Sequence, residues 1–364
     1  MKPIGLYIHI PFCNGKCPYC DFYSVIPNSE TVSQYVNALC EKIDQAGGIY
    51  DTVYFGGGTP SLIGADNIAK IMSHINRTPD CEATLECNPS DTGAVNSLFD
   101  FKIAAKSGIN RISMGLQSAD NAERKALGRR GGCDDVERAI LRAKDAGIDN
   151  ISLDLMLGVP NQTAESLKKS IAFCKKSGAK HVSAYMLKIE EGTPFHKIKD
   201  NLILPDEDET SDLYLLAVDE LKKAGFAQYE ISNFSEKGYE SRHNLKYWRC
   251  EEYLGIGASA HSFKDGKRFF YKRSIADFVS GNPPIDDGTG GNEEEFIMLA
   301  LRLSEGLVFA NYQSRFGKPV PENLICKAKE LEKHGLVKIT DFNISLTVNG
   351  FLLSNSVICA LVDY

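Results

Sequence analysis

The first half of this chain repeatedly alternates short apolar runs with amphipathic helical patterns, and this feature restricts its fold most. Strands are expected at 6–10, 52–55, 83–86, 111–114, 151–155 and 181–186, and helices at 35–45, 66–75, 134–146 and 164–176. Pro205 is expected at the first position of a further helix, with four acids following it in the first turn. Strand–helix units of this length predict an α/β fold with a parallel sheet, open or closed.

A turn-rich stretch at 281–292 separates this region from the C-terminal part of the chain. Beyond it, helices are expected at 294–302 and 325–333 and a hairpin at 337–346, a pattern that predicts a small winged-helix-like module. We therefore expect two domains, residues 1–280 and 281–364. Residues 293–364 carry seven Lys and Arg against nine Asp and Glu. Such an acidic module is a poor DNA binder.

Charge and composition exclude several classes of protein. The formal net charge is −7 at pH 7, whereas a binder of nucleic-acid phosphates needs a basic surface, so no nucleic-acid partner is expected. No apolar run approaches the ~18 residues of a transmembrane helix. The N-terminus lacks the apolar region and cleavage site of a signal peptide. We therefore expect a cytoplasmic protein, which argues against a disulfide framework for its eleven cysteines.

Three of the cysteines, Cys13, Cys17 and Cys20, are concentrated in the segment CNGKCPYC, directly after the first expected strand. Three thiolates this close repel one another unless they share a centre. Structural zinc sites usually pair two-residue knuckles from separate segments, and no second knuckle is present, which favours an iron–sulfur cluster. The alternatives are zinc with His9 as fourth ligand, or three free thiols with no common centre. On a 4Fe–4S cluster, three ligands leave one iron open to a small molecule.

Polar or glycine-rich features recur where the expected strands end. The segment YFGGGTP follows the second strand, Glu86 ends the third, Gln117 follows the fourth, and Asp154 ends the fifth. The carboxyl ends of strands in a parallel β/α barrel carry the active site, whereas the strand interiors are expected to hold apolar side chains. The series therefore predicts one binding site at this end of the sheet.

The cysteine loop, preceded by YIHIPF, resembles the radical S-adenosylmethionine (SAM) superfamily. The resemblance implies an incomplete parallel β/α barrel, a 4Fe–4S cluster held by Cys13, Cys17 and Cys20, and SAM chelated to the open iron. One electron from the cluster would then cleave SAM to a 5′-deoxyadenosyl radical. The glycine-rich turn is similar to the motif that meets the amino group of SAM.

Further motifs narrow the resemblance: YIHIPFC, GGGTPS, ECNP, GLQS and GVPNQT are similar to the oxygen-independent coproporphyrinogen III dehydrogenase (HemN-like) group over nearly the whole chain. The resemblance implies that Tyr19 packs on the adenine side of SAM. It also implies eight further SAM contacts, which are Tyr7, Gly57, Gly58, Thr59, Glu86, Gln117, Arg129 and Asp154. It does not assign a catalytic residue.

Two departures point away from the dehydrogenases. Those enzymes carry a fourth cysteine two residues after the third, where this chain has Phe22, which we expect to pack beside the cluster loop. They also have a substantial N-terminal extension over the substrate site, whereas only six residues precede Tyr7 here. Both features look like the HemW family of proposed haem chaperones.

The HemW resemblance extends to the segment HNLKYW, which contains His243, Tyr247 and Trp248. His243 could offer an imidazole to haem iron, with Tyr247 and Trp248 lining an apolar plane, and Cys250 is a weaker candidate ligand. The alternative is that His243 is a structural histidine whose ring nitrogens are satisfied within the protein.

The sequence therefore predicts a radical SAM protein of haem metabolism that binds haem and passes it to acceptor proteins. One alternative is an enzyme that converts coproporphyrinogen propionates to vinyl groups, and another is a zinc-bearing binding module. The expected partners are haem or a porphyrinogen, a haem-acceptor protein, and an electron donor such as a flavodoxin or a ferredoxin.

Overall fold

The computed structural model describes residues 2–89 and 99–362 of the chain. Six parallel strands form its centre and confirm the expected series, each beginning or ending within a few residues of its predicted bounds. They are β1 (Ile4–Ile10), β2 (Tyr50–Gly57), β3 (Arg77–Cys87), β4 (Arg111–Gln117), β5 (Asn150–Leu157) and β6 (His181–Met186).

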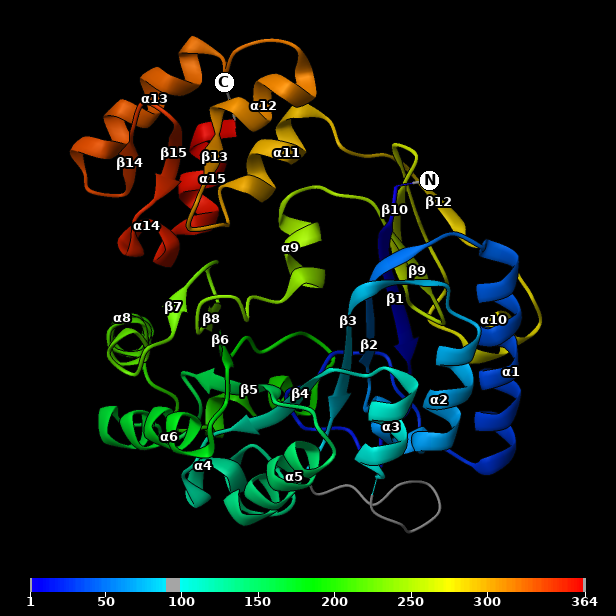
Figure 1. Cartoon of the computed structure of the whole chain (residues 1–364). Coiled ribbons are helices and arrows are strands. Elements are labelled where there is room, and N and C mark those ends of the chain that lie inside the picture. The colour runs from blue at the N-terminus through cyan, green and yellow to red at the C-terminus, as the bar shows by residue number, and fades with distance from the viewer. Residues whose placement is uncertain (1, 90–98, 363–364) are drawn as a thin grey trace.

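Helices cover the outer face of these strands (Figure 1). On β4, for example, Ile112, Met114 and Leu116 are fully buried on the outer side, where the strand packs against α5. The covering helices are α1 (Ser29–Ala46), α2 (Ala65–Ser73), α3 (Phe101–Ser107), α4 (Asn121–Ala126), α5 (Cys133–Asp145), α6 (Ala164–Ser177) and α8 (Glu207–Lys223), and a short 3-10 turn, η1 (Pro60–Ile63), precedes α2.

The start of α8 differs from the prediction. Asp206 is the N-cap: its carboxylate accepts a hydrogen bond from the Glu209 backbone N–H (2.8 Å), and the Glu209 carboxylate accepts one from the Asp206 N–H (2.9 Å). This reciprocal pair fixes the first turn, so Pro205 lies outside the helix rather than at its first position.

Six further strands extend the parallel sheet on both sides. They are β7 (Ala227–Gln228), β8 (Asn233–Ser235), β9 (Tyr253–Ile256), β10 (His261–Lys264), β11 (Lys267–Phe270) and β12 (Ile285–Thr289). The strand order is β12-β11-β10-β9-β1-β2-β3-β4-β5-β6-β8-β7, and within the described residues β12 and β7 do not pair with each other. The sheet is therefore an open, incomplete barrel, as predicted.

The stretch expected to be a loop between the two domains contains β12, whose residues pair with β11 in the large sheet. Two adjacent aspartates and a glycine in this segment are typical of a turn, so the composition did not indicate an edge strand. The division at residue 281 stays a prediction, and the pairing of β12 favours a boundary a few residues later.

The C-terminal unit has the expected helices followed by a hairpin, on a three-stranded sheet of order β13-β15-β14. Its elements are α11 (Glu293–Ala300), β13 (Leu307–Val308), α12 (Phe309–Phe316), α13 (Glu322–Lys333), β14 (Val337–Ile339), β15 (Asn343–Leu346), α14 (Val348–Leu352) and α15 (Ser354–Val362). It docks beside α9 (Arg242–Trp248), as Figure 1 shows. The Ser304 N–H donates to the Tyr229 carbonyl (2.9 Å), and one continuous apolar core runs through both parts.

The inside of the barrel is polar, contrary to the expectation of apolar strand interiors. Ser152 and His181 share a hydrogen bond (2.7 Å), and the other ring nitrogen of His181 bonds the Tyr229 hydroxyl (2.8 Å). The fully buried Arg111 reaches Thr84 Oγ1 at 3.5 Å. Hydrogen bonding among these side chains offsets the cost of removing them from water.

No helix in the described ranges, 2–89 and 99–362, is long and apolar enough to span a membrane.

Candidate functional site

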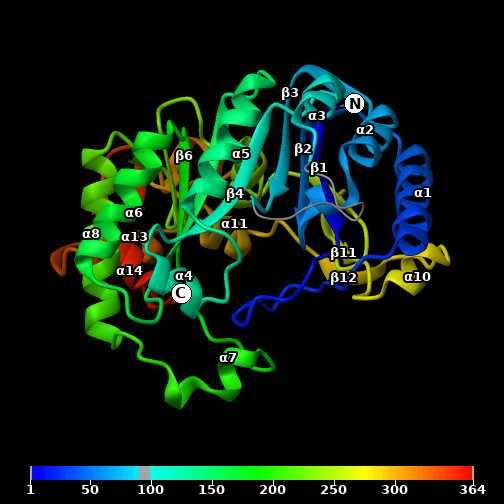
Figure 2. The same cartoon turned by 90° about the horizontal axis from the view of Figure 1, so that it is seen from below.

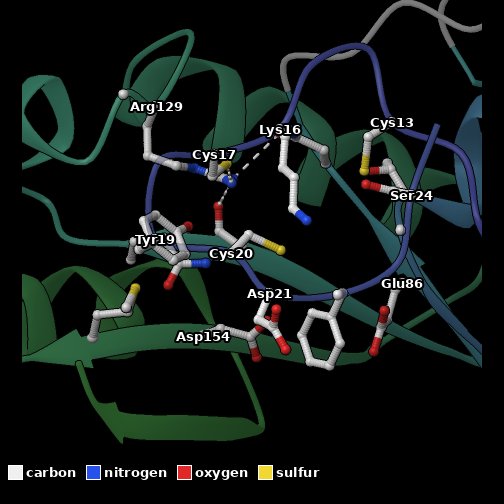
Figure 3. A pocket seen from close by; sticks show the side chains of 18 of the residues that line it. Cys13, Lys16, Cys17, Tyr19, Cys20, Asp21, Ser24, Glu86, Arg129 and Asp154 are labelled. Carbon is white, nitrogen blue, oxygen red and sulfur yellow. Dashed lines mark hydrogen bonds between the residues drawn. The ribbon is translucent and has the colours of Figure 1, made fainter. Parts of the chain in front are cut away.

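A cavity of about 660 Å³ lies at the carboxyl ends of the parallel strands. It brings together all three loop cysteines and the predicted residues from four strands and their following turns (Figure 3). Its wall contains Cys13, Cys17, Tyr19, Cys20, Gly57, Gly58, Thr59, Glu86, Gln117, Arg129 and Asp154. The predicted convergence of the strand ends on one site is therefore observed.

The cysteine loop is held to the strands beside it through its backbone. The Val25 N–H donates to the Pro11 carbonyl (2.8 Å), and the Cys13 N–H donates to the Val25 carbonyl (3.0 Å), which closes the loop at its base. Within the loop, the Cys20 N–H donates to the Cys17 carbonyl (3.1 Å). These bonds bring the three half-buried thiols to one wall of the cavity.

A second segment supports the loop from outside the barrel. Figure 2 shows the short helix α7 (Pro194–Lys197) beside the blue loop. The Phe195 N–H donates to the Pro18 carbonyl (3.0 Å), and the buried Phe195 ring meets the Tyr19 ring edge-on at a centroid distance of 6.2 Å. Tyr19 is thereby fixed between the cavity and α7.

Arg129 links the cysteine loop to β4. Its Nη2 donates to the Gly115 carbonyl (2.8 Å), and its Nη1 lies 3.8 Å from the Cys17 sulfur. Burial lowers the pKa of Arg129, but Tyr19 and the Cys17 thiol raise it by more, so the net shift is upward. A guanidinium charge therefore lies beside the Cys17 sulfur in the cavity wall.

The glycine-rich turn lies tightly against β1 and the cysteine loop. The Gly58 N–H donates to the Ile10 carbonyl (2.9 Å), and the Thr59 N–H donates to the Phe12 carbonyl (2.8 Å). A Cβ on Gly58 would lie 2.5 Å from the Phe12 oxygen. At Gly57, where φ is +112°, a Cβ would lie 2.6 Å from the His9 ring. Only glycine fits these two positions.

Two half-buried carboxyl groups, Glu86 and Asp154, lie in the cavity wall. Glu86 accepts hydrogen bonds from the Tyr54 hydroxyl (2.9 Å) and the Gly57 N–H (3.2 Å). Burial, assisted by the charge of Asp154, raises the pKa of Glu86 to about 7. Burial also raises the pKa of Asp154 to about 6, against hydrogen bonds from Ser183 and Ser113 that favour its ionised form. Such a wall is matched to a cationic ligand.

Gln117 ends β4 with a left-handed backbone conformation, φ +68°. A non-glycine residue rarely adopts this conformation, and the strain is typical of a binding site. It marks the point where the strand turns away at the cavity wall.

Tyr7 and His9 face the barrel interior and do not line the cavity formed by the described residues. The Tyr7 hydroxyl lies 3.0 Å from His9 Nδ1, and its ring stacks on Tyr54. Burial lowers the pKa of His9 to about 4. The SAM contact by Tyr7 stays a prediction, since the cavity wall formed by the described residues does not include this side chain. The same holds for the zinc-binding alternative at His9.

Phe22 lines the cavity but does not pack beside the cluster loop as expected. Its side chain is 66% exposed. The expectation was wrong because the ring lies largely open to the solvent within the loop rather than packed against a neighbouring segment.

The three haem candidates do not form one plane. The two ring nitrogens of the buried His243 bond Thr52 Oγ1 and the Tyr247 hydroxyl, both at 2.8 Å. Burial lowers the pKa of His243 to about 3, so the ring is neutral. Trp248 instead lines a separate cavity of about 290 Å³ beside the C-terminal unit, and Cys250 is buried against Arg315. The structural role of His243, left open by the sequence, is favoured.

Several residues in or behind the cavity wall were missed by sequence reasoning. Tyr54 lies behind the wall, where its hydroxyl bonds Glu86. It resembles an ordinary strand aromatic, although its alternation with Thr52 and Gly56 places it inside the barrel and could have revealed it. Tyr185 and Met186 end β6, where no motif was visible. Lys16 and Arg130 also line the cavity. They stand beside motif residues, but their type and spacing alone do not indicate a role in the site.

The cavity suits the group that the resemblance implied. Three cysteines, a turn that admits no side chain and two half-buried acids meet in a space large enough for an inorganic cluster and a small ligand. In the described part of the chain, no three His, Cys, Asp or Glu side chains are arranged around a single metal ion.

Comparisons with known proteins agree with this geometry. The radical SAM superfamily matches residues 7–174, and the HemN C-terminal domain matches residues 294–353. The solved coproporphyrinogen III oxidase (HemN) from Escherichia coli superposes with a TM-score of 0.83, covering 100% of this chain and 90% of its own at 20% identity, which shows a shared fold.

Full-length relatives are more similar in sequence. The heme chaperone HemW of Bacillus subtilis (strain 168) is 34% identical, with 98% of each chain covered. The heme chaperone HemW of Escherichia coli (strain K12) is 36% identical, with 84% of each covered. Radical SAM membership implies a 4Fe–4S cluster and SAM as cofactors. On its fold, its cysteine loop and these relatives, the chain belongs to the HemW family of the radical SAM superfamily.

Proposed function

We propose that this protein is a haem chaperone that carries a SAM-binding 4Fe–4S cluster in the 660 Å³ cavity. The observation that carries the proposal is the convergence of the three cysteines, the glycine turn and two half-buried acids in one cavity. It occurs in a chain whose relatives are named as haem chaperones. Haem would be the cargo, and a haem-acceptor protein its destination.

The residues of the chain suit the two cofactors. Cys13, Cys17 and Cys20 would hold the cluster, and Arg129 would balance the charge beside Cys17. When bound, the reduced cluster supplies an electron to SAM, and the protein contributes orientation and exclusion of water.

The remaining wall would bind SAM. Glu86 and Asp154 would face its ammonium and sulfonium charges, and the backbone at Gly57 and Gly58 would lie against its methionine part. Thr59, Gln117 and Tyr19 would complete the predicted contacts.

Phe22 favours a chaperone over a porphyrinogen-converting enzyme. It occupies the position at which the dehydrogenases are expected to carry a further cysteine, and its ring is largely exposed. We also propose a cytoplasmic location and an electron donor such as a flavodoxin or a ferredoxin.

The test compares two substrates with anaerobically reconstituted protein. Haemin titration should saturate at a defined stoichiometry. Incubation with coproporphyrinogen III, SAM and a reductant should give no vinyl product at a catalytic rate. Turnover of coproporphyrinogen would overturn the chaperone proposal in favour of the dehydrogenase.

A further inference from the structure

The cavity has two chemically different zones. Its wall contains polar side chains, among them the cysteines, Glu86 and Asp154, and also exposed apolar side chains, which together are called the rim here. Phe22 is 66% exposed, Tyr185 43% and Met186 37%. These side chains come from two segments far apart in sequence, the end of the cysteine loop and the end of β6. Large side chains exposed together at a cavity wall are typical of a ligand-binding surface.

Cations accompany this apolar rim. Lys16 and Arg130 both line the cavity, both are exposed, and in the described ranges neither forms an ion pair with a carboxylate. Figure 3 shows the Lys16 ammonium directed into the cavity. The carboxylates nearest the rim are already engaged, Glu190 with Lys188 (2.6 Å) and Asp21 with Arg273 (3.7 Å). Two positive charges are therefore available to an anionic ligand.

We propose that this rim is the docking site of the tetrapyrrole cargo, with the macrocycle against Phe22, Tyr185 and Met186 and its propionates near Lys16 and Arg130. The inference rests on the proposed function and deepens it by naming the site. A large planar apolar ring with two carboxylates matches an apolar surface flanked by two available cations. His243 is not part of this site, because its two ring nitrogens are bonded within the protein.

The experiment measures binding of protoporphyrin IX by fluorescence anisotropy to the reconstituted protein saturated with SAM. This probe has no iron and so needs no axial ligand. Its affinity therefore depends on the contacts of its ring and its propionates with the rim. Lys16→Gln and Arg130→Gln should each weaken binding about fivefold. The dimethyl ester of the probe should bind wild type weakly and be insensitive to both substitutions.

The apolar contacts are tested separately. Phe22→Ser should weaken binding about tenfold. Met186→Ala should also weaken it, and this variant lies outside the cysteine loop, so cluster loss cannot mimic its effect. Lys168→Gln on α6 and Phe342→Ser on the C-terminal hairpin, where Phe342 is 76% exposed, are matched controls expected to bind as wild type. Iron content is measured for every variant.

The possible outcomes distinguish failure of the proposed docking site from failure of the proposed chaperone function. If wild type binds protoporphyrin IX but the rim variants bind equally well, the site is wrong and the chaperone proposal stands. Loss of SAM affinity in Lys16→Gln or Arg130→Gln, with porphyrin binding unchanged, would assign these cations to the SAM carboxylate and overturn their propionate role. If wild type binds neither haemin nor protoporphyrin IX, the proposed function itself fails.

Discussion

Single residues set the charge of the cavity. Desolvation raises the pKa values of Glu86 and Asp154 to about 7 and about 6, well above those of exposed carboxyl groups. At a pH between its usual pKa and its raised pKa, such a carboxyl group keeps a proton in the folded protein, whereas an exposed carboxyl group is ionised. A cationic ligand therefore competes with that proton for the carboxylate.

We therefore expect SAM binding to weaken as the pH falls from 8 to 6. Below the pKa of Glu86, each pH unit should cost up to about tenfold in affinity, because the carboxyl group must first ionise. Isothermal titration in two buffers of different ionisation enthalpy should show proton release on binding. Glu86→Gln should bind SAM more weakly at pH 8 and show a flatter pH profile. An affinity independent of pH in wild type would contradict a role for these acids.

The cysteines provide a second prediction at this scale. Cys17→Ser should abolish cluster assembly, because the two remaining cysteine thiolates cannot hold a 4Fe–4S cluster. Iron analysis after anaerobic reconstitution should give about four irons per chain in wild type and almost none in the variant. Cys326→Ser, at an exposed cysteine of α13, is the matched control and should retain its iron. A full complement of iron in Cys17→Ser would show that this residue is not a ligand.

At the scale of elements, α7 supports the cysteine loop through a backbone hydrogen bond and the ring of Phe195. Phe195→Ala should cost about 3 kcal/mol of stability and also make the cluster labile. Phe226→Ala, at an equally buried ring remote from the loop, should cost as much stability but leave the cluster intact. The measurement is the decay of visible cluster absorption with a ferrous chelator, beside thermal unfolding. Equal decay rates in the two variants would refute this supporting role.

The parallel strands could be predicted because each is long enough for its apolar residues to form a pattern. Strands β7 to β11 could not, since they span only two to four residues and are defined by their pairing with distant segments. Glu86 and Asp154 predicted the site because they end parallel strands, and the carboxyl ends of parallel strands lie together at one end of the sheet. Lys16 gave no such signal, since its place on the rim depends on how the cysteine loop folds. Tyr185 and Met186 also end a parallel strand, but they belong to no motif that would mark them as part of a site.

The molecule as a whole has one continuous apolar core shared by the barrel and the C-terminal unit. Hydrogen bonds also cross the boundary, as from Ser304 to Tyr229. We expect a single cooperative transition in differential scanning calorimetry, with calorimetric and van't Hoff enthalpies in agreement. Two resolved transitions would instead show that the units unfold independently.

The open sheet leaves β12 as a fully exposed margin of the molecule. Two copies meeting there would continue the hydrogen-bond ladder from one molecule into the next. Asp286 and Asp287 oppose this contact, because an antiparallel encounter brings four negative charges into close apposition. The acidic pair thus opposes edge-to-edge dimerisation through β12, and its repulsion is greatest at the low ionic strength where salt screens least.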